Sequence, residues 1–417
     1  MKLGCPFTKR KGTRMKEKLQ KTKYTYICLS LITLAAATLA ILISNGHLFQ
    51  VLFFNDPDDT GMDFFNSVVA ASNGHPYEQF GVIYPPLANL FFYLLSLFIP
   101  ADVKANWPDH HEALQSIIGR PGDLRMMQSS MLLFLFFLIL SLFLMAMMIH
   151  KRTGSYLLTF CLVFSAGTLA AIERGNVILI AFVLTFFFVE HYNDDNRVMS
   201  ELSLVALAAA FGFKLYPCIF GLLLLKDHKF LATARCILYA VLLTVIPTFF
   251  LDGPRMILPW LRHVMGFGGY SSGETISESA NTAVTSSNGF ISRLPLHWII
   301  AFVLFIFLLI LFFKPFLKLY RSQYLFLIAF LALLVGGSRN SYNLIMFLIP
   351  FLAFLKEEER LTRYNCIEFL IYLAALLPVG INNLTYTFFL LYLIGCGCRI
   401  YHQKKANNYP HQNETHQ

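Results

Sequence analysis

Long uncharged apolar stretches recur along almost the whole chain, and they constrain its fold more than any other feature. Most of them run for about 15 to 22 residues, which is enough to cross the hydrocarbon of a bilayer with modest tilt or thinning. Charged residues make up only 14% of the sequence, whereas they form roughly a quarter of an ordinary soluble domain. The sequence therefore predicts an all-α fold, a polytopic membrane helix bundle surrounded by membrane lipid.

Basic clusters between the apolar stretches predict how the chain crosses the membrane. Residues 1–23 carry many Lys and Arg, and the uncharged segment after them has no cleavage motif. This order indicates a cytoplasmic tail followed by a retained helix. Keeping the later basic clusters inside gives about twelve crossings with both termini cytoplasmic. The membrane domain then covers residues 24–399, and residues 400–417 form a second cytoplasmic tail.

One apolar segment does not fit a simple count of crossings. If Ile83 to Ile99 spanned the bilayer, the next span would place Lys151 and Arg152 on the non-cytoplasmic face. We therefore expect an interfacial or re-entrant helix, whose start is fixed by Pro85 and Pro86.

A second apolar block, Leu202 to Leu225, is interrupted in its middle by Lys214 and Pro217. Two half-helices that meet at residues 212–217 would explain this interruption and keep the following basic cluster inside. Two large loops, 44–127 and 252–297, then lie on the non-cytoplasmic face. A transporter usually keeps its polar residues at mid-membrane, so polarity gathered on one face favours chemistry at the membrane surface.

The first large loop contains GMDFFNSVVAASNGHPYEQFGVIYPPLANL, residues 61–90. Asp63 has apolar neighbours there, as expected if this part of the loop packs on the bilayer. A carboxylate in such a place suits a general base that takes a proton from a sugar hydroxyl. The alternative is an ordinary solvated acidic loop, which is how the earlier Asp56, Asp58 and Asp59 are interpreted. Tyr77 and Tyr84 fit either an interfacial aromatic belt or a surface on which a sugar stacks.

The order of short motifs in this loop resembles a known family. Asp63 is followed by Ala70-Ala71, then by Gly74 to Tyr77, and then by Tyr84-Pro85-Pro86-Leu87. This order is similar to the N-terminal signature of the polyprenol-phosphate-mannose-dependent mannosyltransferases, a family of the GT-C superfamily of membrane glycosyltransferases. The resemblance covers about residues 24 to 355, and this first signature is its most specific part.

Further short matches follow in the family's order. Gly175-Asn176-Val177 resembles a Gly-Gln-x-Asn element without its Gln, and Lys214 to Pro217 resembles a Lys-x-x-Pro break. Ser287-Asn288-Gly289 with Arg293 resembles an Asn-Gln-Ser-x-x-Gly and Arg step, and Ser338 to Tyr342 resembles the last outer motif. Where the family often carries a His after that motif, this chain has Asn343. The donor sugar or its handling is therefore expected to differ.

The resemblance implies a GT-C fold, a non-cytoplasmic active site and an inverting transfer with Asp63 as base. The donor would be a polyprenyl-phosphate-linked hexose, with mannose as the expected sugar, and the acceptor a cell-envelope glycan or glycolipid. Such a donor needs cations to hold its phosphate. For Arg174, an ion pair with the adjacent Glu173 is an equal alternative. The expected substrate-binding residues are Tyr77, Tyr84, Arg174, Asn176, Lys214, Asn288, Arg293, Arg339 and Asn343.

Other functions are less well supported by the sequence. The net charge of +9 does not point to nucleic acid, because the basic residues follow the expected topology. No His or Cys spacing is typical of a metal site, and no cofactor is expected. An O-antigen polymerase or ligase, or a polytopic lipid or sugar transporter, remains the alternative. The expected location is the cell inner membrane or plasma membrane, with several passes.

Overall fold

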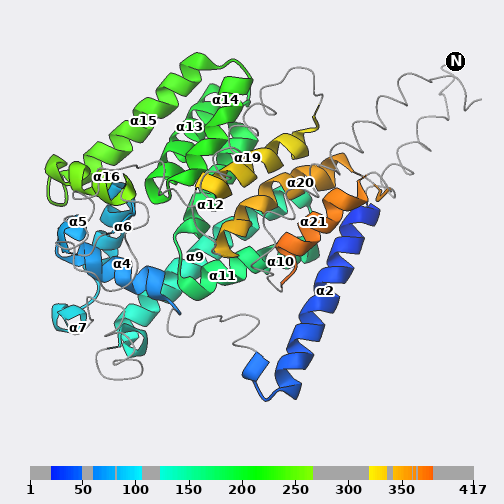
Figure 1. Ribbon diagram of the computed structural model, residues 1–417, viewed down its shortest axis with the longest axis horizontal. Coiled ribbons are helices and arrows are strands. Elements are labelled where there is room, and N and C mark those ends of the chain that lie inside the picture. The colour runs from blue at the N-terminus through cyan, green and yellow to red at the C-terminus, as the bar shows by residue number, and fades with distance from the viewer. Residues whose placement is uncertain are drawn as a thin grey trace, which may run out of the picture.

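The computed structural model describes residues 20–48, 60–79, 82–105, 123–265, 319–335, 341–358, 360–362 and 365–378. Throughout these residues every regular element is a helix (Figure 1), which confirms the all-α expectation for this part of the chain. The α-helices are α2 (Gln20–Ile43), α4 (Met62–Ser72), α5 (Pro76–Gln79), α6 (Pro86–Ser96), α7 (Ala101–Ala105), α9 (Gln128–Thr153), α10 (Tyr156–Val163), α11 (Ala166–Arg174), α12 (Ile178–His191), α13 (Arg197–Phe213), α14 (Leu222–Lys226), α15 (Phe230–Thr248), α16 (Ile257–Met265), α19 (Arg321–Val335), α20 (Leu348–Glu357) and α21 (Cys366–Leu376). The 3-10 helices are η2 (Leu124–Met126), η3 (Tyr216–Gly221), η4 (Pro254–Met256) and η6 (Ser341–Phe347).

Three of the described helices are long and apolar enough to cross a bilayer, namely α2, α9 and α15. A fourth crossing results if α10 and α11 are counted together, although the pair is bent by 56°. These helices identify a membrane protein. The further crossings expected from the basic clusters stay a prediction.

The buried core includes side chains of α12, which packs on α13, and of α19, which packs on α20. Phe182 and Phe186 stack on one face of α12, Phe188 lies on another face, and all three are buried. A helix that is apolar all round is typical of the interior of a membrane bundle. By contrast, α2 leans away from the other helices (Figure 1), and most of its apolar side chains are exposed, as expected of a helix that faces lipid.

Helix α6 begins where the two prolines predicted it would. Pro85 has an extended backbone, and Pro86 opens the helix, where a missing N–H costs no hydrogen bond. The helix has 11 residues, so it is about 16 Å long, roughly half the thickness of the hydrocarbon. This length agrees with an interfacial or re-entrant helix.

The structure also confirms the helix break expected at residues 212–217. Helix α13 ends at Phe213, Lys214 has an extended backbone, and a 3-10 helix follows from Tyr216. Helix α13 begins at Arg197, five residues before the expected start. The reason is local, because the Asn196 side chain accepts hydrogen bonds from the backbone N–H groups of residues 198 and 199 and so caps the helix.

Candidate functional site

Asp63 lies in the first turn of α4, which is anchored on the end of α11. The helix is preceded by Gly61, whose backbone has a positive φ of 74°. Its N–H donates a hydrogen bond of 2.7 Å to the carbonyl of Glu173. This bond joins two segments that are far apart in the sequence. It brings the first turn of α4 beside Arg174 and the turn that follows it.

The Asp63 carboxylate is held by two side chains from that turn. Arg174 donates to both of its oxygens, from Nη2 at 3.0 Å and from Nε at 3.3 Å. Asn176 Nδ2 donates to Oδ2 at 2.5 Å. The Asp63 and Arg174 side chains are 17% and 25% exposed, so the pair is partly open to its surroundings. Asp63 is therefore neither a freely solvated loop residue nor sealed in the core.

The turn that carries Arg174 and Asn176 has a tightly fixed backbone. Gly175 has a φ of 65°, and an added Cβ would lie 2.6 Å from the Phe134 ring and 2.8 Å from Phe64 Cβ. Only glycine fits such a place without strain. Asn176 is fully buried, and its Oδ1 accepts a 2.9 Å hydrogen bond from the N–H of Ile178. Asn176 thus supports the start of α12 with its amide oxygen and orients Asp63 with its amide nitrogen.

Lys214 lies at the break between α13 and η3, where aromatic side chains surround it. Its Nζ donates to the Tyr84 hydroxyl at 3.3 Å and lies 4.5 Å from the centre of the Tyr84 ring. The ring of Tyr342 is 5.2 Å away on η6. The charges of Asp63 and Arg174 also act on Lys214, so these residues form one electrostatic cluster. We call Asp63, Arg174, Asn176, Lys214 and Tyr84 the Asp63 cluster.

Asn343 lies next to this cluster, at the position where the resembling family often has a His. It is buried, and its Oδ1 accepts a short hydrogen bond from the Tyr216 hydroxyl. The bond joins η3 to η6 and so fixes the segment that carries Lys214. A neutral amide in this place provides a structural hydrogen bond and carries no charge.

Tyr77 lies behind Tyr84, with its ring buried. Its hydroxyl donates a 2.6 Å hydrogen bond to the Tyr84 carbonyl and accepts a 2.8 Å bond from Asn89 Nδ2. Burial raises the pKa of Tyr77, although the bond from Asn89 acts in the opposite direction, so the hydroxyl stays protonated and keeps donating. Through these hydrogen bonds Tyr77 fixes the backbone at Tyr84.

The start of the second large loop packs against the first. His75 Nδ1 lies 3.0 Å from an Asp252 carboxylate oxygen, and Trp260 Nε1 donates to the Ile83 carbonyl at 3.2 Å. Trp260, Met256 and Tyr77 form a small buried group of their own. The described parts of the two loops, which were expected on one face, therefore lie side by side at the same end of the bundle.

Sequence reasoning brought some site residues together and missed others. Asn288, Arg293 and Arg339 lie outside the described residues, so their place in the site stays a prediction. Tyr216 and Tyr342 were not expected to bind anything, although both stand within the motifs that carry Lys214 and Asn343. The expected alternative pairing of Arg174 with Glu173 gives way to the pairing with Asp63.

Comparison with known proteins identified no relative of this chain. No family model, curated protein or solved structure matches the chain. Within the described residues, no group of His, Cys, Asp and Glu is arranged to hold a metal ion. The Asp63 cluster must therefore be interpreted from its own geometry.

Proposed function

We propose that this protein is a membrane glycosyltransferase of the GT-C type, with about twelve crossings, which uses a polyprenyl-phosphate-linked hexose. It would act at the non-cytoplasmic face of the cell inner or plasma membrane, on a glycan or glycolipid acceptor. The observation that carries the proposal is the Asp63 cluster. It places one partly exposed carboxylate beside two cations, Arg174 and Lys214, at the meeting point of four separate helical segments.

In the proposed reaction, Asp63 takes the proton of the acceptor hydroxyl as its oxygen bonds to the anomeric carbon. The bond between that carbon and the phosphate oxygen breaks, and the electron pair leaves with the polyprenyl phosphate. Because the leaving group is already a stabilised anion, no strong general acid is needed. Lys214, with its three ammonium donors, would hold the phosphate through charge-assisted hydrogen bonds.

The ion pair with Arg174 affects when Asp63 can act as the base. In this pair both Asp63 oxygens accept hydrogen bonds from Arg174, so the guanidinium occupies the atoms that would take the acceptor's proton. A donor phosphate beside the cluster would compete with Asp63 for Arg174, since guanidinium binds phosphate as well as carboxylate. We propose that Arg174 turns toward the donor when it binds, which couples donor binding to the release of the base.

A transporter of lipid or sugar is the alternative that one observation favours. Lys214 lies at a break between α13 and η3, and transporters often bind their substrates at such broken helices. The two functions differ in product. Purified protein incubated with a panel of polyprenyl-phosphate sugars and acceptor would release polyprenyl phosphate if it is a transferase, whereas a transporter would move intact donor across vesicles.

A further inference from the structure

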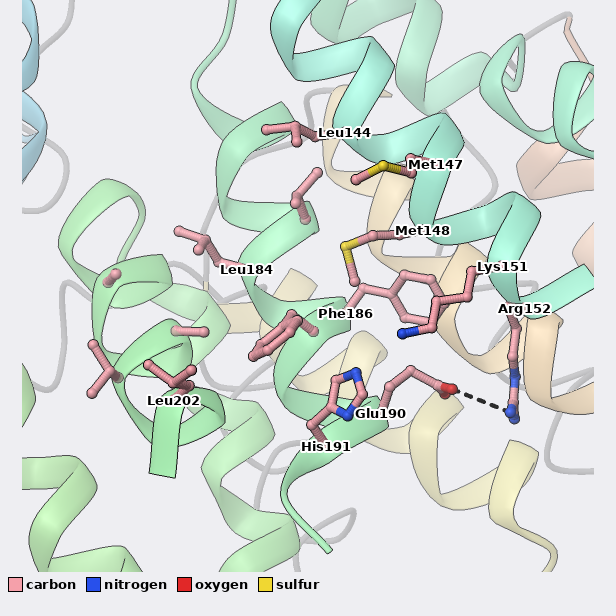
Figure 2. A pocket seen from close by; sticks show the side chains of 15 residues that line it. Leu144, Met147, Met148, Lys151, Arg152, Leu184, Phe186, Glu190, His191 and Leu202 are labelled. Carbon is pink, nitrogen blue, oxygen red and sulfur yellow. Dashed lines mark ion pairs between the residues drawn. The ribbon is translucent and has the colours of Figure 1, made fainter. Parts of the chain in front are cut away.

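A large apolar groove lies on the side of the bundle, between α9, α12 and α13. It encloses about 840 Å³, and most of its lining is aliphatic or aromatic (Figure 2). It opens outward, since Met147 of α9 and Leu202 of α13 line it and are each about half exposed. Helix α9 is apolar enough to span a bilayer, so the mouth of this groove faces lipid tails.

The polar end of the groove, at Lys151, is remote from the Asp63 cluster, whereas its apolar lining reaches Ala209, five residues before Lys214. Phe134 of α9 packs against Phe64 and Phe65 of α4, with ring centres 5.2 and 5.3 Å apart, which places the start of α9 beside the cluster. Lys151, at the other end of α9, lines the groove. At a rise of 1.5 Å per residue, about 25 Å of helix separates Phe134 from Lys151. The polar end of the groove therefore lies at the opposite end of the bundle from the cluster.

The polar end of the groove carries the positive charge of Lys151, whereas the carboxylates near it are paired with other residues. Glu190 pairs with Arg152 at 3.1 Å, and Asp194 pairs with His191 Nδ1 at 3.0 Å. Lys151 is exposed, and among the described residues no carboxylate forms an ion pair with it, although the charge of Asp194 acts on it. Figure 2 shows the Lys151 side chain pointing into the groove, while Arg152 turns toward its partner Glu190.

We infer that this groove binds a phospholipid with an anionic headgroup. Its acyl chains would lie along the apolar walls between α9, α12 and α13, and its phosphate would contact Lys151 at the level of the headgroups. Basic residues at the ends of grooves between membrane helices are typical sites for anionic lipids. The Lys stem can reach such a phosphate because its methylene groups pack on apolar surface. This site is separate from the proposed donor site and does not depend on it.

The test is to map where a photoreactive lipid labels the full-length protein. Phosphatidylglycerol with a diazirine on one acyl chain is incorporated at trace level into phosphatidylcholine vesicles that contain the protein, and labelled peptides are identified by mass spectrometry. We expect labels on the groove-facing residues of α9, α12 and α13. The matching phosphatidylcholine probe should label them about fivefold less, because one Lys near an anionic headgroup contributes about that factor.

Two variants and one control test the headgroup contact and the apolar groove separately. Lys151→Met keeps the length and apolar character of the side chain, and it should reduce phosphatidylglycerol labelling to the phosphatidylcholine level. Ala209→Leu narrows the groove and should reduce labelling by both probes. Lys356→Met removes an exposed cation at the same end of the bundle, outside the groove, and should change nothing.

Several results would overturn the inference. Equal labelling by the two probes, unaffected by Lys151→Met, would show that the headgroup is not recognised. An unlabelled groove would mean that another segment of this chain fills it. Cross-links between two copies through α9, measured separately with a bifunctional reagent, would show that the groove is a subunit interface. If Ala209→Leu fails to fold, the surface variant Lys151→Met still decides the outcome.

Discussion

At the scale of single residues, Lys214 gives the clearest prediction about donor binding. Lys214→Met removes the ammonium, and with it the hydrogen bond and the cation–π contact to Tyr84, while keeping the length and the apolar stem of the side chain. A hydrogen bond to a charged group contributes about 1.5 to 3 kcal/mol. We therefore expect binding of a lipid-linked donor, measured by equilibrium binding in detergent, to weaken by about ten- to a hundredfold. An unchanged affinity would assign Lys214 a structural role.

Arg174 tests whether the site needs a planar cation. Arg174→Lys keeps the charge but cannot donate to both oxygens of Asp63 in the fixed two-pronged geometry that arginine provides. We expect the rate of donor turnover to fall by about tenfold or more, because loss of one charge-assisted hydrogen bond costs about 1.5 to 3 kcal/mol. Thermal unfolding should shift little, since the charge remains. Full activity in Arg174→Lys would contradict the coupling proposed between donor binding and release of Asp63.

At the scale of helices and turns, substitution of Gly175 should destabilise the protein far more than substitution of Gly154, a glycine with a similar backbone conformation. Gly175 and Gly154 have φ values of 65° and 66°, but a Cβ at Gly154 would meet no atom within 4 Å. Gly154→Ala should therefore cost only the strain of the backbone, about 1 kcal/mol. Gly175→Ala adds a steric clash with Phe134 and Phe64, for which about 1 to 3 kcal/mol more is expected. Chemical unfolding in detergent checks the difference, and equal losses would contradict the packing described here.

Much of the order of helices could be predicted from sequence, because its causes are local. Pro86 starts α6, and Lys214 with Pro217 interrupts the helix after α13, as the residue types alone indicate. The bend between α10 and α11 was missed, since its residues are as apolar as those of a straight span. The early start of α13 could not be expected from the apolar block, which begins at Leu202, because the cap comes from the polar side chain of Asn196.

The candidate site was less predictable, because its contacts join distant parts of the chain. Asp63 and Arg174 are 111 residues apart, and no local pattern shows that they meet. From the sequence, the only partner that could be expected for Arg174 was its immediate neighbour Glu173. The same holds for Asn343 and Tyr216, which are 127 residues apart.

At the scale of the whole molecule, the proposed topology places Asp63 and Lys151 on opposite sides of the membrane. Helix α9 has 26 residues and is about 39 Å long, enough to cross the hydrocarbon. A reporter enzyme fused after Lys104 should behave as non-cytoplasmic, and one fused after Lys151 as cytoplasmic. A cytoplasmic result at Lys104 would remove the interfacial placement of α6 and, with it, the proposed position of Tyr84.

The proposed chemistry depends on Asp63 more than on any other residue. Asp63→Asn keeps the shape of the side chain and removes the basicity that proton abstraction requires. Loss of a general base typically slows a reaction by about 10²- to 10⁴-fold. Donor binding should survive, because Lys214 and Arg174 remain. Asp56→Asn, in the same acidic loop, is the matched control, and it should stay within about twofold of the parent because the sequence predicts a solvated residue there.

The most direct measurement is the rate at which purified protein releases polyprenyl phosphate from a lipid-linked hexose in the presence of acceptor. The account predicts release by the parent and by Asp56→Asn, and a loss of about 10²-fold or more in Asp63→Asn that is shown to be folded and inserted. If Asp63→Asn turns over donor at the parental rate, Asp63 is not the base, and the segment from Gly61 to Leu90 serves packing alone.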